Sequence, residues 1–142
     1  MTLRDVLLPL FAEVILTFGL VFWAAALRVR DLRSGVVKPR DIALREPNWP
    51  VPTRQVAYSY SNQFELPVLF YVLTILALIT HHAGVLFVVL AWIFVIFRVL
   101  QAYIHVTSNK VPLRGAFFGV AALALAINWL VFMFDILAGP WV

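Results

Sequence analysis

The sequence contains no cysteine, and this absence excludes disulfides, thiolate metal ligands and a cysteine nucleophile. Charged residues are scarce as well: they make up 13% of the 142 residues, whereas 63% of the residues are hydrophobic. So little polar surface cannot coat a water-soluble domain of this length. The composition therefore predicts a single membrane-embedded unit over residues 1–142, in which any thiol chemistry needs a thiol brought by a ligand.

The catalytic and metal-binding motifs of soluble enzymes are missing too. The sequence shows no Ser-His-Asp arrangement, no glycine-rich phosphate loop and no pair of carboxylates at catalytic spacing. His81 and His82 are adjacent but have no carboxylate nearby, which is more typical of a membrane interface than of a metal site. The net charge of +4 comes from basic residues beside apolar runs, so we expect no metal site and no nucleic-acid partner.

Four apolar stretches are long enough to cross a bilayer, which takes about 20 helical residues. We expect spans over residues 6–27, 57–80, 85–106 and 115–137, with a basic loop over residues 28–56. The first stretch lacks an A-x-A-like cleavage site and is interpreted as a span, not as a signal peptide. Because the apolar runs are continuous and do not alternate, they favour helices over barrel strands. The predicted fold is an all-α integral membrane bundle of four transmembrane helices.

Lysine and arginine lie mostly in the two loops that follow the first and third spans. These residues are Arg28, Arg30, Arg33, Lys38, Arg40, Arg45, Arg54, Lys110 and Arg114. The positive-inside rule predicts that both loops are cytoplasmic and that both termini lie outside, which is the periplasm for a bacterial inner membrane. The first loop, with four prolines and Trp49, is either an interfacial segment attracted to anionic lipid or a lid over a cytoplasm-facing site.

Ionisable side chains inside a span cost roughly 2.5 to 3.5 kcal/mol each, so each needs a partner or a purpose. The chain has five of them: Glu13, Glu65, Arg98, His105 and Asp135. Glu13 and Asp135 lie toward the outer ends of the first and fourth spans, with no cation evident nearby. We expect a structural role for these two carboxylates.

The remaining polar residues form two helical stripes near the cytoplasmic end. One stripe comprises Tyr58, Ser61, Asn62 and Glu65, extended by Arg54, and the other comprises Arg98, Gln101 and His105. Their i, i+3, i+4 and i+7 spacing predicts that the stripes face each other and that Glu65 pairs with Arg98. The stripes either join the helices or, with the spare donors of Asn62, His105, Asn109 and Arg114, hold an anionic ligand.

These residues resemble the MAPEG family, the membrane-associated proteins in eicosanoid and glutathione metabolism. The resemblance rests on three segments: Asn62-Gln63-Phe64-Glu65-Leu66-Pro67, Arg98 to His105, and Asn109 to Arg114. In topology it covers nearly the whole chain. It implies a homotrimer of four-helix protomers, with a glutathione site between neighbouring protomers near the cytoplasmic face.

The resemblance also implies roles for individual residues. Asn62 and Glu65 match the glutathione-contacting Asn and Glu of the family, and Arg98 matches a basic residue of the third helix. Arg114 matches the arginine thought to lower the pKa of the bound thiol, because a guanidinium stabilises a thiolate. The implied site has Arg114 and His105 as catalytic residues and Asn62, Glu65, Arg98, Arg54 and Tyr58 as glutathione ligands.

The chain departs from the glutathione-using members of the family at a few of these positions. Those members carry arginines just before the helix-two Asn, where this chain has Tyr58 and Ser61, and Arg54 lies one turn further away. His105 and Phe118 stand where those members have tyrosines.

Three functions follow as alternatives. The first is a glutathione-dependent transferase or peroxidase that acts on hydrophobic electrophiles in the bilayer. The second is a non-enzymatic scaffold or accessory subunit of a larger membrane complex. The third is a small transporter or proton relay built on Glu13, Glu65 and Asp135, which ranks last because four spans form no pathway alone and the halves show no inverted repeat.

Overall fold

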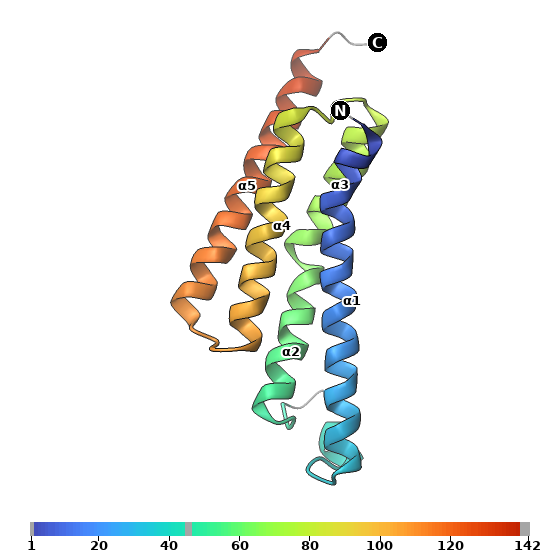
Figure 1. The fold of residues 1–142 in the computed structure, drawn as a ribbon, viewed down its shortest axis with the longest axis vertical. Helices are drawn as coiled ribbons and strands as arrows, with labels where there is room; N and C mark the ends of the chain where they lie inside the picture. The colour runs from blue at the N-terminus through green and yellow to red at the C-terminus, as the bar shows by residue number, and fades with distance from the viewer. Residues whose placement is uncertain (1, 45–46, 140–142) are drawn as a thin grey trace.

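A computed structural model describes residues 2–44 and 47–139, and this part of the chain is helical with no strand. The α-helices are α1 (Leu3–Arg33), α2 (Val51–Ser61), α3 (Leu66–Ile79), α4 (Val85–Val106) and α5 (Val111–Ala138). Two short 3-10 helices, η1 (Pro39–Ile42) and η2 (Asn62–Phe64), precede and follow α2. Helices α2, η2 and α3 follow one another along a single path, so the bundle has four long elements (Figure 1). Each of the four is long and apolar enough to span a membrane, which confirms the predicted fold class.

The bundle has two chemically different ends. The N-terminus, the α3–α4 connection and the end of α5 lie together at one end, called here the terminal end (Figure 1). The end of α1, the start of α2 and the α4–α5 turn lie toward the other, called the basic end because the arginine-rich loops are there. This arrangement places the two polar stripes in the same half of the molecule.

The helices at the basic end are longer than the sequence predicts. Helix α1 continues past residue 27 to Arg33, with Arg30 and Arg33 in its last turn, where cations interact favourably with the helix dipole. Helix α2 begins at Val51, not at residue 57, with Pro52 in its first turn, where the missing N–H costs nothing. The segment between the two helices is therefore shorter than the expected loop over residues 28–56.

The end of α1 and the start of α2 are tied together by a buried carboxylate. Asp31 is 3% exposed, and one of its oxygens accepts a short hydrogen bond from the Thr53 hydroxyl. The other oxygen forms an ion pair with Arg30 at 2.9 Å. This contact fixes the first residues of α2 against α1.

Apolar side chains fill the interior toward the terminal end. Phe70 and Phe94 pack with ring centroids 4.9 Å apart, and Leu73, Ala91 and Ala121 are buried around them. Small residues such as Ala91 and Ala121 let helices approach closely, which stabilises packing where lipid removes the hydrophobic driving force between helices. Many large apolar side chains on the outside of the bundle remain exposed, as expected for surfaces in contact with lipid.

The second span is interrupted between α2 and α3. Glu65 has φ −97° and ψ −107°, which is not helical, and Pro67 follows in the first turn of α3. Because proline has no N–H to donate and disfavours a helical conformation for the residue before it, it ends the regular ladder of backbone hydrogen bonds. The break leaves carbonyl groups near residue 62 available to other donors.

Candidate functional site

Arg98 is the centre of the polar interior. Its side chain is 1% exposed and lies on α4 opposite the break in the second span. The guanidinium donates to the Asn62 carbonyl at 2.6 Å and to Gln63 Oε1 at 3.1 Å. It also donates to Gln101 Oε1, one turn further along α4, at 2.6 Å. The Asn62 carbonyl, which also accepts from the Glu65 N–H at 3.4 Å, thus accepts from Arg98 across the bundle, and the two polar stripes face each other as predicted.

The predicted ion pair between Glu65 and Arg98 is wrong. In the described ranges 2–44 and 47–139, the only ion pairs join Arg30 to Asp31 and Arg40 to Asp41. The Glu65 side chain is exposed and acts on Arg98 only as a more distant charge. The reason is the break itself: it presents a carbonyl and Gln63 to the guanidinium, whereas a continuous helix would have presented Glu65.

His105 lies one stripe position beyond Gln101 and is 5% exposed. Its Nδ1 is 3.4 Å from Asn62 Nδ2. When the Asn62 amide donates in this contact, Nδ1 carries no proton and the neutral ring bears its N–H on Nε2. In that tautomer the free edge of His105 is a hydrogen-bond donor.

Arg114 enters the site from the first turn of α5. It is half-buried, and its Nη1 donates to Asn109 Oδ1 at 2.6 Å. Asn109 has φ 49° in the α4–α5 turn, and its N–H donates to the Ile104 carbonyl at 2.7 Å. The turn thus holds the Arg114 guanidinium close enough to His105 for the two to interact electrostatically.

Arg54 and Tyr58 lie in a separate cavity nearer the basic end. This cavity has a volume of about 510 Å³ and is also lined by Arg28, Trp49 and Ser61. The Arg28 guanidinium stacks over the Trp49 ring, 5.4 Å from its centroid, and Arg54 Nε is buried without a hydrogen-bond partner. The structure therefore brings Asn62, Arg98 and His105 into contact, places Glu65 and Arg114 beside them, and leaves Arg54 and Tyr58 in a cationic cavity further along α2.

The comparison with known families found a match. Residues 6–134 match the model of the MAPEG family. The chain is a member of the MAPEG family. No curated protein and no solved structure matches it. Membership, together with the four long apolar helices, makes this an integral membrane protein of a family that includes glutathione transferases and peroxidases.

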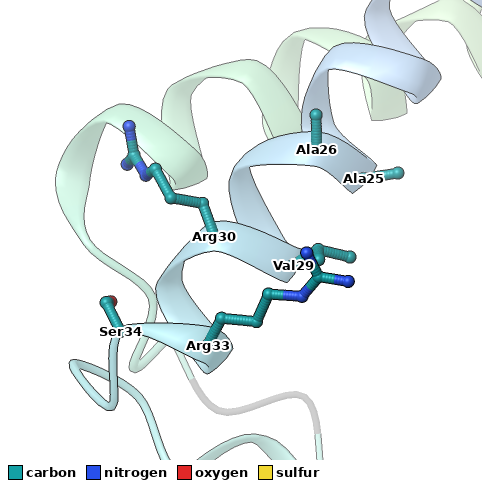
Figure 2. A pocket seen from close by; sticks show the side chains of 6 residues that line it. All are labelled: Ala25, Ala26, Val29, Arg30, Arg33 and Ser34. Atoms are coloured by element: carbon teal, nitrogen blue, oxygen red, sulfur yellow. The ribbon is translucent and has the colours of Figure 1, made fainter.

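A second surface depression in this MAPEG chain is unrelated to the site. It lies on the last turns of α1 and is lined by Ala25, Ala26, Val29, Arg30, Arg33 and Ser34 (Figure 2). Of its two cations, Arg30 is already paired with Asp31. None of the predicted site residues borders it, and its lining is largely apolar apart from the two arginines and Ser34.

Sequence reasoning missed Gln63 in this MAPEG chain. Gln63 is 2% exposed, donates to the Ser59 carbonyl at 2.9 Å and accepts from Arg98. It falls outside the stripe that contains Asn62 and Glu65, because the spacing of that stripe assumes an unbroken helix. Its position four residues before Pro67, where a carbonyl loses its helical donor, is the signal that could have identified it.

The expectation for Glu13 also needs correction. The sequence places this residue toward the outer end without a nearby cation, but its side chain is 0% exposed and Arg98 acts on it electrostatically. This electrostatic interaction acts between α1 and α4 without an ion pair, and it depends on how the helices are rotated in the bundle. Asp135, by contrast, is exposed near the terminal end of α5.

Proposed function

We propose that this protein is a glutathione-dependent transferase or peroxidase that acts on hydrophobic electrophiles dissolved in the bilayer. The observation that carries the proposal is the exposed carboxylate of Glu65 at the helix break, three residues after Asn62, whose side-chain amide contacts His105. An exposed charge within a membrane span needs a binding partner, since lipid cannot solvate it. The mixed signs of the surrounding groups suit a zwitterionic ligand.

Glutathione has the complementary groups: an ammonium, two carboxylates and a thiol. Glu65 is suited to the ammonium, and Asn62 offers its side-chain amide. Arg54 and Tyr58, with Arg28 beside them, are suited to a carboxylate. Eight helical residues separate Arg54 from Asn62, about 12 Å, while three extended residues reach about 10 Å. A tripeptide engages both groups of residues if the Arg54 side chain spans the remaining distance of about 2 Å.

The chemistry that we propose is nucleophilic attack by the glutathione thiolate. Arg114 favours the thiolate over the thiol, because a guanidinium stabilises the negative sulfur. The sulfur forms a bond to the electrophilic carbon, and the bond to the leaving group breaks with its electron pair. His105, in the tautomer that its contact with Asn62 favours, would donate a hydrogen bond from Nε2 to the developing negative charge.

An apolar groove supports the choice of substrate. It has a volume of about 330 Å³ and lies between α1 and α4, lined by Leu16, Leu20, Trp23, Ala102 and Val106 among others. These α4 residues alternate with Gln101 and His105 along the helix, so the groove lies at the same depth as the polar cluster. A hydrophobic electrophile could enter it directly from the bilayer.

We further propose a homotrimer, in which a neighbouring protomer covers the exposed side of Glu65. An uncovered carboxylate in lipid is costly, whereas a cleft between protomers can hold both the carboxylate and its ligand. The arginine-rich basic end would face the cytoplasm and both termini the opposite side, which is the periplasm for a bacterial inner membrane.

The test is glutathione binding, measured by calorimetry on the purified protein, together with conjugation of a standard hydrophobic electrophile. We expect heat of binding and conjugation in the wild type, and a loss of affinity of about tenfold in Glu65→Gln. Asp135→Asn is the matched control, because this exposed carboxylate lies at the other end of the bundle. Absence of both heat and conjugation would end the proposal.

A non-enzymatic scaffold is the second candidate, and the hydrogen bonds of Arg98 favour it. The three acceptors of this guanidinium are protein groups on α4 and at the break in the second span. These hydrogen bonds hold the two spans together independently of any ligand. If the protein is only a scaffold, Arg114→Ala leaves every activity unchanged, while Arg98→Ala or Glu65→Ala disrupts assembly.

A further inference from the structure

We propose that Glu13 is the buried counter-charge of Arg98 and that it thereby leaves the Glu65 carboxylate free for the ammonium group of glutathione. The part that concerns the ammonium rests on the function proposed above. The pairing of Glu13 with Arg98 does not.

Glu13 is a buried acid that the structure does not otherwise explain. Both of its carboxylate oxygens are buried without a hydrogen-bond partner, and the side chain is 0% exposed. Arg98 has the same character: it is 1% exposed, and its Nε also lacks a partner. A buried carboxylate without a hydrogen-bond partner and a buried guanidinium with a free Nε, in one interior, point to an interaction between them, because neither can reach water.

Two carboxylates act electrostatically on the Arg98 guanidinium: Glu13 on α1 and Glu65 at the break in the second span. Helix α1 packs against α4, so the buried side chains of Glu13 and Arg98 share one interior.

The hydrogen bonds of Arg98 do not neutralise it. Its acceptors are the Asn62 carbonyl and the amide oxygens of Gln63 and Gln101, all of which are neutral. They satisfy N–H donors but leave a net positive charge in the interior. A carboxylate has to supply the balance, and in the described part of the chain Glu13 and Glu65 are the carboxylates that act on Arg98 electrostatically.

Glu13 and Glu65 differ in where they lie. Glu13 has no access to any ligand, whereas Glu65 is exposed. If Glu65 were the counter-ion, it would have to turn inward and would be lost as a ligand for an ammonium group. The two carboxylates therefore have different roles. Buried Glu13 neutralises Arg98, and exposed Glu65 binds the ammonium group of the ligand.

The first experiment compares glutathione with an analogue that lacks the α-amino group, by calorimetry on the full-length protein. We expect the wild type to prefer glutathione by about tenfold, as a charge-assisted contact implies. In Glu13→Gln we expect this preference to shrink toward one, mainly through weaker binding of glutathione, because Arg98 draws Glu65 inward. A merely structural role for Glu13 would weaken both ligands equally, and that result would overturn the inference.

Thr17→Val is the matched control for α1. Thr17 is one turn from Glu13 and donates to the Glu13 backbone carbonyl at 3.0 Å, so it perturbs the same part of the helix without changing charge. We expect the preference for the amino group to be retained in this variant. Loss of the preference in both variants would also contradict the inference.

The second experiment needs no glutathione. Thermal unfolding in detergent is measured for Glu13→Gln, Arg98→Met and the double variant, and the same cycle is repeated with Glu65→Gln. We expect the midpoint shifts of the first cycle to be strongly non-additive and those of the second to be nearly additive. Additivity in the first cycle and coupling in the second would overturn the pairing. If the wild type binds no glutathione but the first cycle is coupled, the proposed function fails and the counter-charge stands.

Discussion

The two halves of this bundle have interiors built from different kinds of side chain. Toward the terminal end, Phe70, Leu73 and Phe94 fill an apolar interior and α3 is continuous. Toward the basic end, Arg98 and His105 are buried, and the second span breaks beside them. Because the helices of the terminal half pack through apolar side chains, helix packing alone does not require the polar side chains of the basic half.

The comparison teaches where to look for function in an all-helical membrane protein. Buried polar groups cost free energy unless they are paired, so a region that concentrates them needs a reason. In this chain the concentrated polar residues coincide with a helix break and with an exposed carboxylate. The following substitutions test whether the polar half is more sensitive to change than the apolar terminal half.

The largest effect is expected for Arg98→Leu. It leaves the side chains of Gln63 and Gln101 without their donor and removes the cation that acts electrostatically on Glu13. Breaking such a buried set typically costs about 3 to 5 kcal/mol of unfolding free energy. Denaturation in detergent micelles measures it, with Arg33→Gln as control, since that arginine is exposed at the end of α1. A stability equal to the control would show that the polar half is as tolerant as the apolar half.

Arg114→Ala is expected to affect catalysis more than folding. Loss of one preorganised positive group should lower kcat/KM for conjugation by about 100-fold at neutral pH. The deficit should shrink as the pH rises above about 8.5, because a free thiol then ionises without help. The pH profile of kcat/KM is the measurement. Lys110→Gln, an exposed cation in the same turn, should leave the profile unchanged, and an equal effect in both variants would refute a specific role for Arg114.

Thr53→Val tests the hydrogen bond that ties α2 to α1 at the basic end. The substitution keeps the shape of the side chain but removes the hydroxyl that donates to buried Asp31. A lost hydrogen bond to a buried charged group costs about 2 kcal/mol, measured as unfolding free energy in detergent. Thr80→Val is the control, because the Thr80 hydroxyl bonds only to the Leu76 carbonyl at the exposed end of α3. Equal values for both would mean that the Asp31 contact adds no stability.

The number of spans could be predicted from the sequence because it depends on a local property, the length of each apolar run. Helix α4 illustrates this: the expected range 85–106 is also the observed one, Val85–Val106. The ends of α1 and α2 could not be placed in the same way. Polar residues extend both helices beyond the apolar run, and whether they do so depends on contacts such as the one between Asp31 and Thr53.

The pairing within the site was predictable only in part. The helical period correctly opposed Asn62 to Arg98 and His105, because residues on one face stay together over two turns. It failed for Glu65, since Pro67 breaks the helix and turns that residue away from Arg98. Glu13 lay beyond any local pattern. Its approach to Arg98 depends on which face of α1 turns toward α4, and an apolar helix leaves that rotation undetermined.

The smallest effect is expected at Asn128, a strongly buried amide of the terminal half. Its side chain is 2% exposed and donates to the Phe87 carbonyl at 3.2 Å, which joins α5 to α4. Hydrogen bonds between membrane helices contribute about 0.6 kcal/mol on average, and Leu has the same branching of heavy side-chain atoms as Asn. Asn128→Leu should therefore change the unfolding free energy in detergent by less than about 1 kcal/mol. A loss as large as that of Arg98→Leu would erase the distinction between the two halves, because polar groups would then be equally important throughout the bundle.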